Sequence, residues 1–168
     1  MTWSGERILW LATAAMVVLL DQAAKVLATL LLAPGEAVAV APVLNLVLVR
    51  NEGAAFSLLR EAGGWQRWLL AAVAAAVSLL LLRWLLRLEA GHRAEGLGLA
   101  LVLGGAVGNL ADRLRLGHVV DFLDLHWRGW HWPAFNLADA AITAGVAVLL
   151  GCELFRRSSR RGSAAPPP

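Results

Sequence analysis

The segment GGAVGNLADRLRLGHVVDFLDLHWRGWHWPAFNLADAAI at residues 104–142 decides the fold, because it places polar side chains between two apolar helical stretches. An ionisable group at membrane depth costs roughly 2.5–3.5 kcal/mol even on lenient insertion scales. Charges in such surroundings therefore indicate a site. The segment holds the aspartates Asp112, Asp121, Asp124 and Asp139. We predict that Asp121 and Asp139 are a catalytic carboxylate pair at the membrane surface.

The composition is that of a membrane protein. Of the 168 residues, 59% are hydrophobic and 16% are charged, whereas soluble domains carry about 25% charged residues. The length allows one domain, residues 1–168. Much of the net charge of +3 comes from arginines in the tail 156–168, which is a topology signal, so we expect no nucleic-acid binding. The single cysteine, Cys152, excludes an internal disulfide.

Four apolar stretches are long enough to cross a bilayer core of roughly 30 Å. They are residues 8–32, 68–86, 97–116 and 137–155. The first also resembles a secretory signal, but Asp21 and Lys25 inside it favour an uncleaved span. The glycines of the third stretch predict close packing between helices. The predicted fold class is therefore an all-α integral membrane protein with four transmembrane helices. We expect the tail 156–168 to be disordered.

Residues 36–60 change character, after a Pro-Gly pair that breaks the first helix. Alternating and β-branched segments near 38–40 and 44–49 predict a small β-sheet on the membrane surface. The turn at 51–56 contains small residues, where a ligand backbone could approach closely. A plain hairpin loop explains this turn as well.

Lysines and arginines in short loops indicate the orientation of the spans. The tail and the segment 83–96 are rich in arginine, so we expect both termini in the cytoplasm. Segments 33–67 and 117–138 then lie outside, and the second is predicted to be a loop that holds Asp121 and Asp124. Arginines at positions 50, 60 and 67 weaken this charge bias.

The carboxylate side chains are the available candidates for catalytic groups in this sequence. There is no HExxH motif, and His118, His126 and His131 share no helical spacing, so we expect no metal and no cofactor. Ser57 and Ser78 have no evident base. Two carboxylates close together cannot both ionise, so one keeps a proton while the other acts as a base that activates water.

Two helical features support this interpretation. Asp21 and Lys25 lie four residues apart, on one face of the first span. They can form a neutralised ion pair between packed helices, support a polar site, or do both. Asp139 lies in the first turn of the last span, where the helix dipole favours negative charge, and we interpret it as the ionised partner of the pair.

Two other classes of function fit some of these features. A small transporter or proton-coupled channel would also carry intramembrane Asp, Asn and Lys, but here they cluster at one boundary, and no inverted repeat is visible. A non-catalytic assembly protein or chaperone that binds lipid-modified tails is the second alternative. Detection of a peptide product distinguishes the peptidase from both.

The order of five motifs resembles the lipoprotein signal peptidase family, also called signal peptidase II. The motifs are DQAAK at 21–25, NEGAAFSLL at 51–59, GGAVGNLADR at 104–113, VVDF at 119–122 and FNLADAAI at 135–142. Each motif alone is a weak indication of the family, but their order and spacing on a four-span chain make the combination specific.

The resemblance implies an aspartic endopeptidase with four transmembrane helices and a small extracytoplasmic β-cradle. It implies removal of the signal peptide from diacylglyceryl-modified prolipoproteins, just before the lipid-modified cysteine. The enzyme would reside in the bacterial inner membrane, with its active site near the periplasmic face. Its partners would be this substrate and membrane lipids, and we expect a monomer to suffice.

The resemblance also assigns roles to individual residues. Asp121 and Asp139 would be the catalytic dyad. The residues that would bind substrate or support the dyad are Asn51, Gly53, Asn109, Arg113, Asn136 and Ala138. Asp21, Lys25 and Asp112 would give structural polar support.

Overall fold

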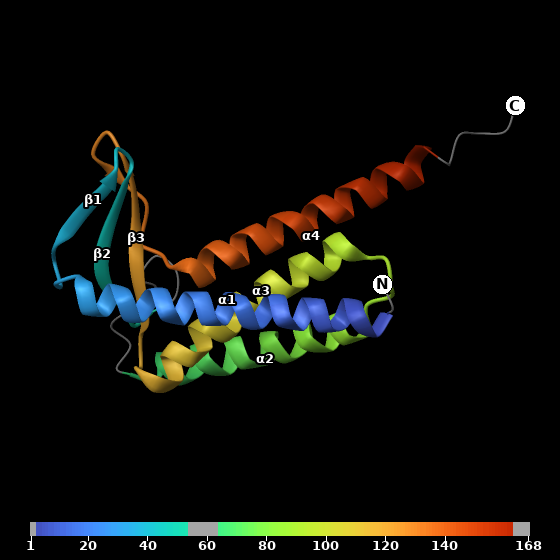
Figure 1. The fold of residues 1–168 in the computed structure, drawn as a ribbon, viewed down its shortest axis with the longest axis horizontal. Coiled ribbons are helices and arrows are strands. Elements are labelled where there is room, and N and C mark those ends of the chain that lie inside the picture. The colour runs from blue at the N-terminus through green and yellow to red at the C-terminus, as the bar shows by residue number, and fades with distance from the viewer. Residues whose placement is uncertain (1–2, 54–63, 163–168) are drawn as a thin grey trace, which may run out of the picture.

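The computed structural model describes residues 3–53 and 64–162 (Figure 1). The elements are the helices α1 (Trp3–Leu31), α2 (Gln66–Arg87), α3 (Arg93–Arg115) and α4 (Leu137–Gly162), and the strands β1 (Ala37–Ala41), β2 (Leu44–Asn51), β3 (Val119–Trp127) and β4 (Trp130–His131). The helices form a bundle, and the strands gather at one end of it.

The four helices of the described residues are each long and apolar enough to cross a membrane. Their outward side chains suit a lipid surrounding, since large apolar residues such as Leu30, Leu79 and Phe155 are 74%, 67% and 79% exposed. In water such a surface would be an aggregation hazard. The predicted fold class, four spanning helices with a small sheet, is confirmed.

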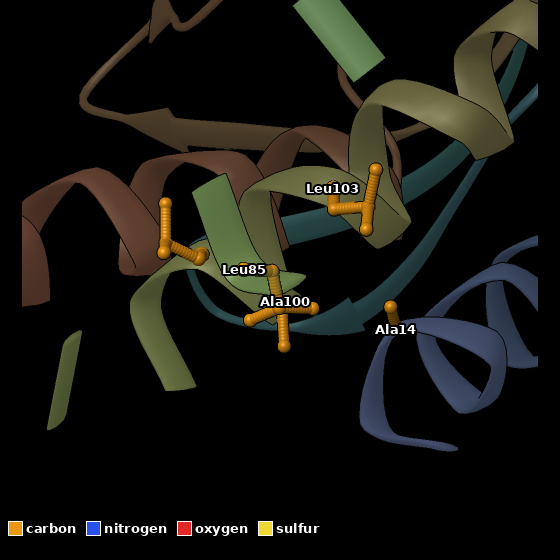
Figure 2. Packing of buried hydrophobic residues seen from close by; sticks show 5 residues of the cluster. Ala14, Leu85, Ala100 and Leu103 are labelled. Carbon is orange, nitrogen blue, oxygen red and sulfur yellow. The ribbon is translucent and has the colours of Figure 1, made fainter. Parts of the chain in front are cut away.

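Helix α3 is the centre of the bundle, because it packs against the other three helices. Leu99 and Ala100 of α3 are fully buried in an apolar cluster with Leu85 of α2 and Ala14 of α1 (Figure 2). The glycines of α3 allow this close approach. A Cβ atom at Gly104 would lie 2.7 Å from the carbonyl oxygen of Ala14. The predicted role of these glycines in helix packing is thereby supported.

The sheet is antiparallel, with strand order β1-β2-β3-β4. The prediction of strands near 38–40 and 44–49 matches β1 and β2. The part of the predicted β region at 54–60 lies outside the described residues.

One correction concerns the segment after α3. We predicted a loop around Asp121 and Asp124, but both residues lie in strand β3. The first four residues of β3 are all buried, so both faces of the strand are covered. In this first half of β3, the alternation of apolar and polar residues that marks a half-exposed strand is therefore missing.

A second difference concerns the tail. Helix α4 continues beyond Phe155 to Gly162, so its last turns include residues that we predicted to be disordered. Arg156 pairs with Glu153 one turn earlier, and such i,i+3 ion pairs support exposed helices. Figure 1 shows this end of α4 diverging from the other helices.

Candidate active site

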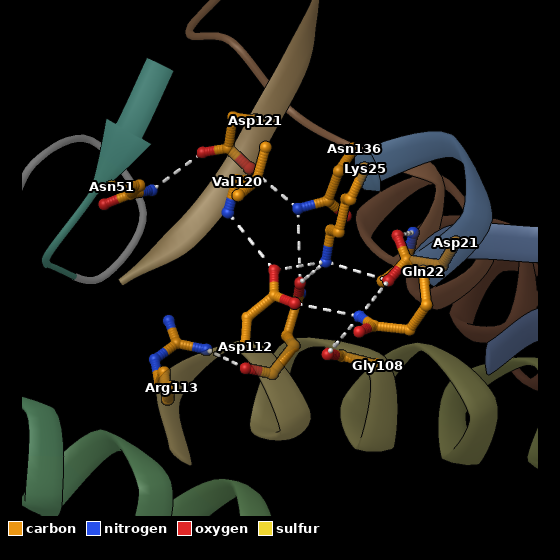
Figure 3. Close-up of polar contacts among 12 residues, drawn as sticks. Asp21, Gln22, Lys25, Asn51, Gly108, Asp112, Arg113, Val120, Asp121 and Asn136 are labelled. Carbon is orange, nitrogen blue, oxygen red and sulfur yellow. Dashed lines mark hydrogen bonds and ion pairs between the residues drawn. The ribbon is translucent and has the colours of Figure 1, made fainter. Parts of the chain in front are cut away.

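Asp121 lies on β3, where the strand passes the ends of the helices. Its side chain is almost completely buried, with 2% exposure. Each carboxylate oxygen accepts one amide hydrogen bond. Asn51 Nδ2 donates to Oδ2 at 3.0 Å and Asn136 Nδ2 donates to Oδ1 at 2.7 Å (Figure 3). Asn51 reaches this position because β2 pairs with β3.

Asp139 lies in the first turn of α4. Its Oδ1 accepts a 2.7 Å hydrogen bond from Asn109 Nδ2, and its Oδ2 accepts a 3.3 Å bond from the backbone N–H of Asn136. In return, Asn136 Oδ1 accepts the backbone N–H of Asp139 at 2.9 Å. This reciprocal arrangement is a capping box, which satisfies free N–H groups at the helix start.

Asn136 therefore contacts both aspartates. Its side-chain amide binds Asp121, and its backbone N–H binds Asp139. The same Nδ2 atom lies 3.2 Å from Asn109 Oδ1. The side chain is fully buried, so its hydrogen bonds are not weakened by exchange with bulk water.

The two aspartates line one cavity of about 460 Å³. The polar lining comes from Arg50, Asn51, Asn109, Arg113, Asp121, Asp139 and Thr143. The apolar lining comes from Val49, Val119, Trp132, Pro133, Ala134, Phe135 and Ile142. A largely apolar cavity with a few convergent polar groups is the usual form of a ligand-binding site.

Burial raises the pKa of Asp121 to about 6. The hydrogen bond from Asn51 opposes this rise, and the negative charge of Asp139 adds to it. Desolvation disfavours the charged form of a carboxyl group, and a nearby carboxylate acts in the same direction. Asp121, which lies in strand β3 and not in a helix, therefore retains its proton more readily than a free aspartate does.

A buried network lies beneath the pair. Lys25 Nζ contacts Asp21 Oδ2 at 2.8 Å, Asp112 Oδ2 at 2.9 Å and Asn109 Oδ1 at 3.0 Å. Gln22 Nε2 also binds Asp112 Oδ1, at 2.8 Å. Three of these residues were predicted as polar support, whereas Gln22 was missed. Its place beside Asp21 in the DQAAK motif was the available signal.

Two aspartates of this network hold backbone of the elements that carry the pair. Asp112 Oδ2 accepts the backbone N–H of Val120 at 3.2 Å, and Asp21 Oδ1 accepts that of Ala138 at 2.9 Å. Val120 and Ala138 each directly precede one of the two cavity aspartates. Ala138 itself is fully buried and does not line the cavity.

Arg113 connects α3 to the turn after β2. Its guanidinium donates to the carbonyl oxygens of Asn109 at 3.3 Å and of Gly53 at 3.4 Å. The backbone N–H of Gly53 binds Asn51 Oδ1 at 3.1 Å, which is an Asx turn. Arg67 was missed as a support of this region. It donates to the carbonyl oxygen of Arg113 at 2.8 Å, and no motif singled it out.

The remaining polar candidates lie apart from the cavity. Asp124 Oδ2 accepts from Asn45 at 3.0 Å, and both carboxylate oxygens of Asp124 lie 2.9 Å from His131 Nδ1. His126 stacks on His131. Within residues 3–53 and 64–162, no three side chains of the metal-ligating types come together.

The fold and the paired aspartates define a class, a multi-pass membrane protein with the site chemistry of an aspartic peptidase. The family described as Signal peptidase (SPase) II matches residues 13–155. The chain belongs to this family, and its activity is that of signal peptidase II, an aspartic peptidase.

Curated relatives agree with this assignment. A lipoprotein signal peptidase of Paraburkholderia phymatum is 51% identical over 152 residues, which cover 90% of this chain and 91% of the relative. A lipoprotein signal peptidase of Aeromonas hydrophila is 51% identical over 148 residues, covering 88% and 87%. The family and the activity predicted from the motifs are confirmed.

A solved structure shares the fold. It is described as a bacterial membrane enzyme determined by the in meso method at 2.3 Å resolution. The TM-score is 0.81 at 29% sequence identity, and the match covers 94% of this chain and 92% of that chain. The bundle with a sheet at one end is therefore an arrangement that a bacterial membrane enzyme adopts.

Proposed function

We propose that Asp121 and Asp139 form a catalytic dyad that removes the signal peptide from diacylglyceryl-modified prolipoproteins, just before the lipid-modified cysteine. The observation that carries the proposal is the position of Asn136. This buried residue hydrogen-bonds both carboxylates, and both carboxylates line one cavity. A water molecule in that cavity can contact the pair.

The two acids have different surroundings, which suits different roles. Asp139 lies at a helix N-terminus, where the helix dipole favours negative charge, so it serves as the ionised base. Asp121 is buried, and its pKa is raised to about 6, so it serves as the acid. In the resting dyad the proton belongs to the pair.

The reaction then follows the general acid–base scheme of carboxylate pairs. Asp139 takes a proton from water as the water oxygen bonds to the scissile carbonyl carbon. Asp121 gives its proton to the carbonyl oxygen. Collapse of the tetrahedral intermediate breaks the C–N bond. The proton held by Asp139 passes to the leaving amine, and Asp121 takes a proton back from a hydroxyl group of the intermediate, which restores the starting state of the pair.

The cavity also suits an extended peptide next to lipid. Arg113 lines it and can donate to a substrate carbonyl, while Val49, Phe135 and Ile142 offer an apolar wall. The acyl chains of the substrate can remain in the bilayer while the polar end of the cavity supplies water. A peptide bond in hydrocarbon is otherwise held in helix and shielded from water.

The proposed orientation places the sheet outside and both termini in the cytoplasm. The N-terminal end of α1 and the C-terminal end of α4 lie away from the sheet (Figure 1). The arginines near these ends follow the positive-inside rule. We propose that the monomer is active in the inner membrane.

Purified Asp121→Asn and Asp139→Asn variants test the dyad on a diacylglyceryl-prolipoprotein in detergent. Each variant is expected to lose about 10²–10⁴-fold in kcat, the usual contribution of general acid–base catalysis. The parent enzyme should also show a bell-shaped pH–rate profile with two macroscopic pKa values. Near-parental cleavage by either variant contradicts the dyad.

A further inference from the structure

The ammonium group of Lys25 uses all of its hydrogen-bonding capacity inside the protein. Lys25 is 3% exposed, and a lysine ammonium has three N–H donors. Three acceptors surround it, on Asp21, Asp112 and Asn109, at 2.8, 2.9 and 3.0 Å. The two carboxylates suffice to compensate the charge. The third contact is to Asn109, which in turn donates to Asp139 of the proposed dyad.

The contact from Lys25 determines which way the Asn109 amide points. The oxygen and nitrogen of a carboxamide have nearly the same shape, so packing alone does not choose between the two orientations. Here Asn109 Oδ1 accepts from Lys25, and Nδ2 donates to Asp139 Oδ1 at 2.7 Å. A flipped amide would turn N–H groups toward the ammonium and its oxygen toward the carboxylate, and both contacts would be repulsive.

Asn136 favours the same orientation. Its Nδ2 atom donates to Asn109 Oδ1 at 3.2 Å and to Asp121 Oδ1 at 2.7 Å. Lys25 is therefore the first donor in a series of hydrogen bonds that runs through Asn109 to Asp139. Asn109 Oδ1 also accepts from Asn136, the residue that donates to Asp121.

We infer that Lys25 is a positioning residue for Asp139, which acts by holding the Asn109 amide with its N–H groups toward the carboxylate. The inference rests on the proposed dyad. It goes beyond charge compensation, since it gives the lysine an effect on the rate of the chemical step. Misplacement of a reacting group by about 1 Å can cost on the order of 100-fold in rate.

A double-mutant cycle on kcat tests the inference. Lys25→Met and Asn109→Ala are each expected to lower kcat by about 100-fold, with KM changed less than threefold. In the Asn109→Ala background, Lys25→Met should lower kcat by a much smaller factor than in the parental background, because the amide through which it acts is absent and only its contacts with Asp21 and Asp112 remain to be lost. Independent effects would instead multiply.

Gln22→Met is the matched control. Gln22 Nε2 contacts Asp112 at 2.8 Å and Asp21 at 3.3 Å, the same two aspartates that Lys25 contacts. Within the described chain, its other hydrogen-bond partners are Gly108 and Arg115, and so include neither Asn109 nor the dyad. This variant should unfold at a lower temperature and keep kcat near the parental value. It separates damage to the ion network from loss of orientation at Asn109.

Two outcomes overturn the inference. In one, Lys25→Met lowers kcat by the same factor in the parental background and in the Asn109→Ala background. In the other, Gln22→Met lowers kcat as much as Lys25→Met does. If Lys25→Met does not fold, the cycle is run with Lys25→Gln, which keeps an N–H donor and should lose less activity.

The outcome for Lys25 is separable from the outcome for the dyad. If Asp139→Asn retains parental activity, the dyad itself is wrong. If Asp139→Asn is inactive while the Lys25 cycle is multiplicative, the dyad stands and only the positioning role fails.

Discussion

Asp121 accepts a 2.7 Å hydrogen bond from the side chain of Asn136, the residue that also caps helix α4. Asn136 thus links strand β3 to the start of helix α4, the two elements that carry the aspartates of the proposed dyad. Asn136 is fully buried and donates to both acids, to Asp121 through its side chain and to Asp139 through its backbone N–H. Changes at Asn136 should therefore separate the stability of the helix from the activity of the pair.

Asn136→Ser tests this separation. Serine caps helices about as well as asparagine, but its hydroxyl is too short to replace the Nδ2 donor to Asp121. We expect kcat to fall by about 100-fold. The capping contribution to stability should be retained, as measured by thermal unfolding in detergent.

Asn136→Ala is the companion variant, which removes the cap as well as the donor. It should lose similar activity and, in addition, about 1 kcal/mol of stability relative to the serine variant. Equal unfolding temperatures for serine and alanine would show that the cap contributes nothing here. A serine variant with parental kcat would show that the amide does not position Asp121.

The raised pKa of Asp121 predicts a pH dependence of stability. Its pKa is about 6 in the folded protein against an ordinary value of 3.8. Between these values the folded state holds a proton that the unfolded state has released, so stability falls as pH rises through this window. The full difference is about 3 kcal/mol.

Asp121→Asn removes this titration. The loss of stability of the parent between pH 4 and pH 6.5 should therefore exceed that of the variant, when both are followed by thermal unfolding in the same detergent. Parallel curves would mean that the carboxyl group of Asp121 titrates at its ordinary value.

Asp124 offers a contrast on the same strand. Desolvation raises its pKa, but hydrogen bonds from Asn45 and His131 outweigh this and hold the pKa below the ordinary value. Its ionised form is thus stabilised by folding, and the stabilisation is lost as pH falls through the lowered pKa. Because Asp124 does not line the cavity, Asp124→Asn should keep kcat within about threefold of the parent while losing acid-range pH dependence of unfolding. A loss of activity comparable to that of Asp121→Asn would contradict the distinction between these aspartates.

Much of the architecture could be predicted from the chain because its signals are local. Long apolar runs predict spans whatever they pack against, and a Pro-Gly pair ends a helix without help from distant residues. Strand β3 was missed because both of its faces are covered at Val119–Phe122, which removes the alternating pattern. The helical extension past Phe155 was missed because a basic, polar stretch has the composition of a disordered tail.

The aspartates could be proposed from their residue type and their apolar surroundings, but their partners could not. Lys25 and Asn109 lie 84 positions apart in the chain, and Asp21 and Ala138 lie 117 apart. No local pattern records such contacts. Arg67 was overlooked for this reason, since its importance comes only from the carbonyl groups that the fold brings to it. Gln22 was overlooked although it lies beside Asp21 in the DQAAK motif, because its contact with Asp112 spans 90 positions.

Gly108 lies where helix α3 packs against Asp21 of α1, which supports the site. A Cβ atom at this position would lie 2.7 Å from Asp21 Oδ2. That carboxylate cannot move freely, because it binds Lys25 at 2.8 Å and, through its other oxygen, the backbone N–H of Ala138 at 2.9 Å. Gly108→Ala should therefore displace Asp21 and, with it, the start of α4.

We expect Gly108→Ala to cost about 1–3 kcal/mol of stability, the usual cost of overpacking, and to lower kcat by at least tenfold because Asp139 follows Ala138. Gly151→Ala is the control. It also lies in a helix, but nothing lies within 4 Å of an added Cβ, so alanine should be neutral or stabilise by up to about 1 kcal/mol. Thermal unfolding and kcat, measured on both variants, test this prediction. If Gly108→Ala matches Gly151→Ala in both measurements, the contact between α1 and α3 does not control the position of Asp139.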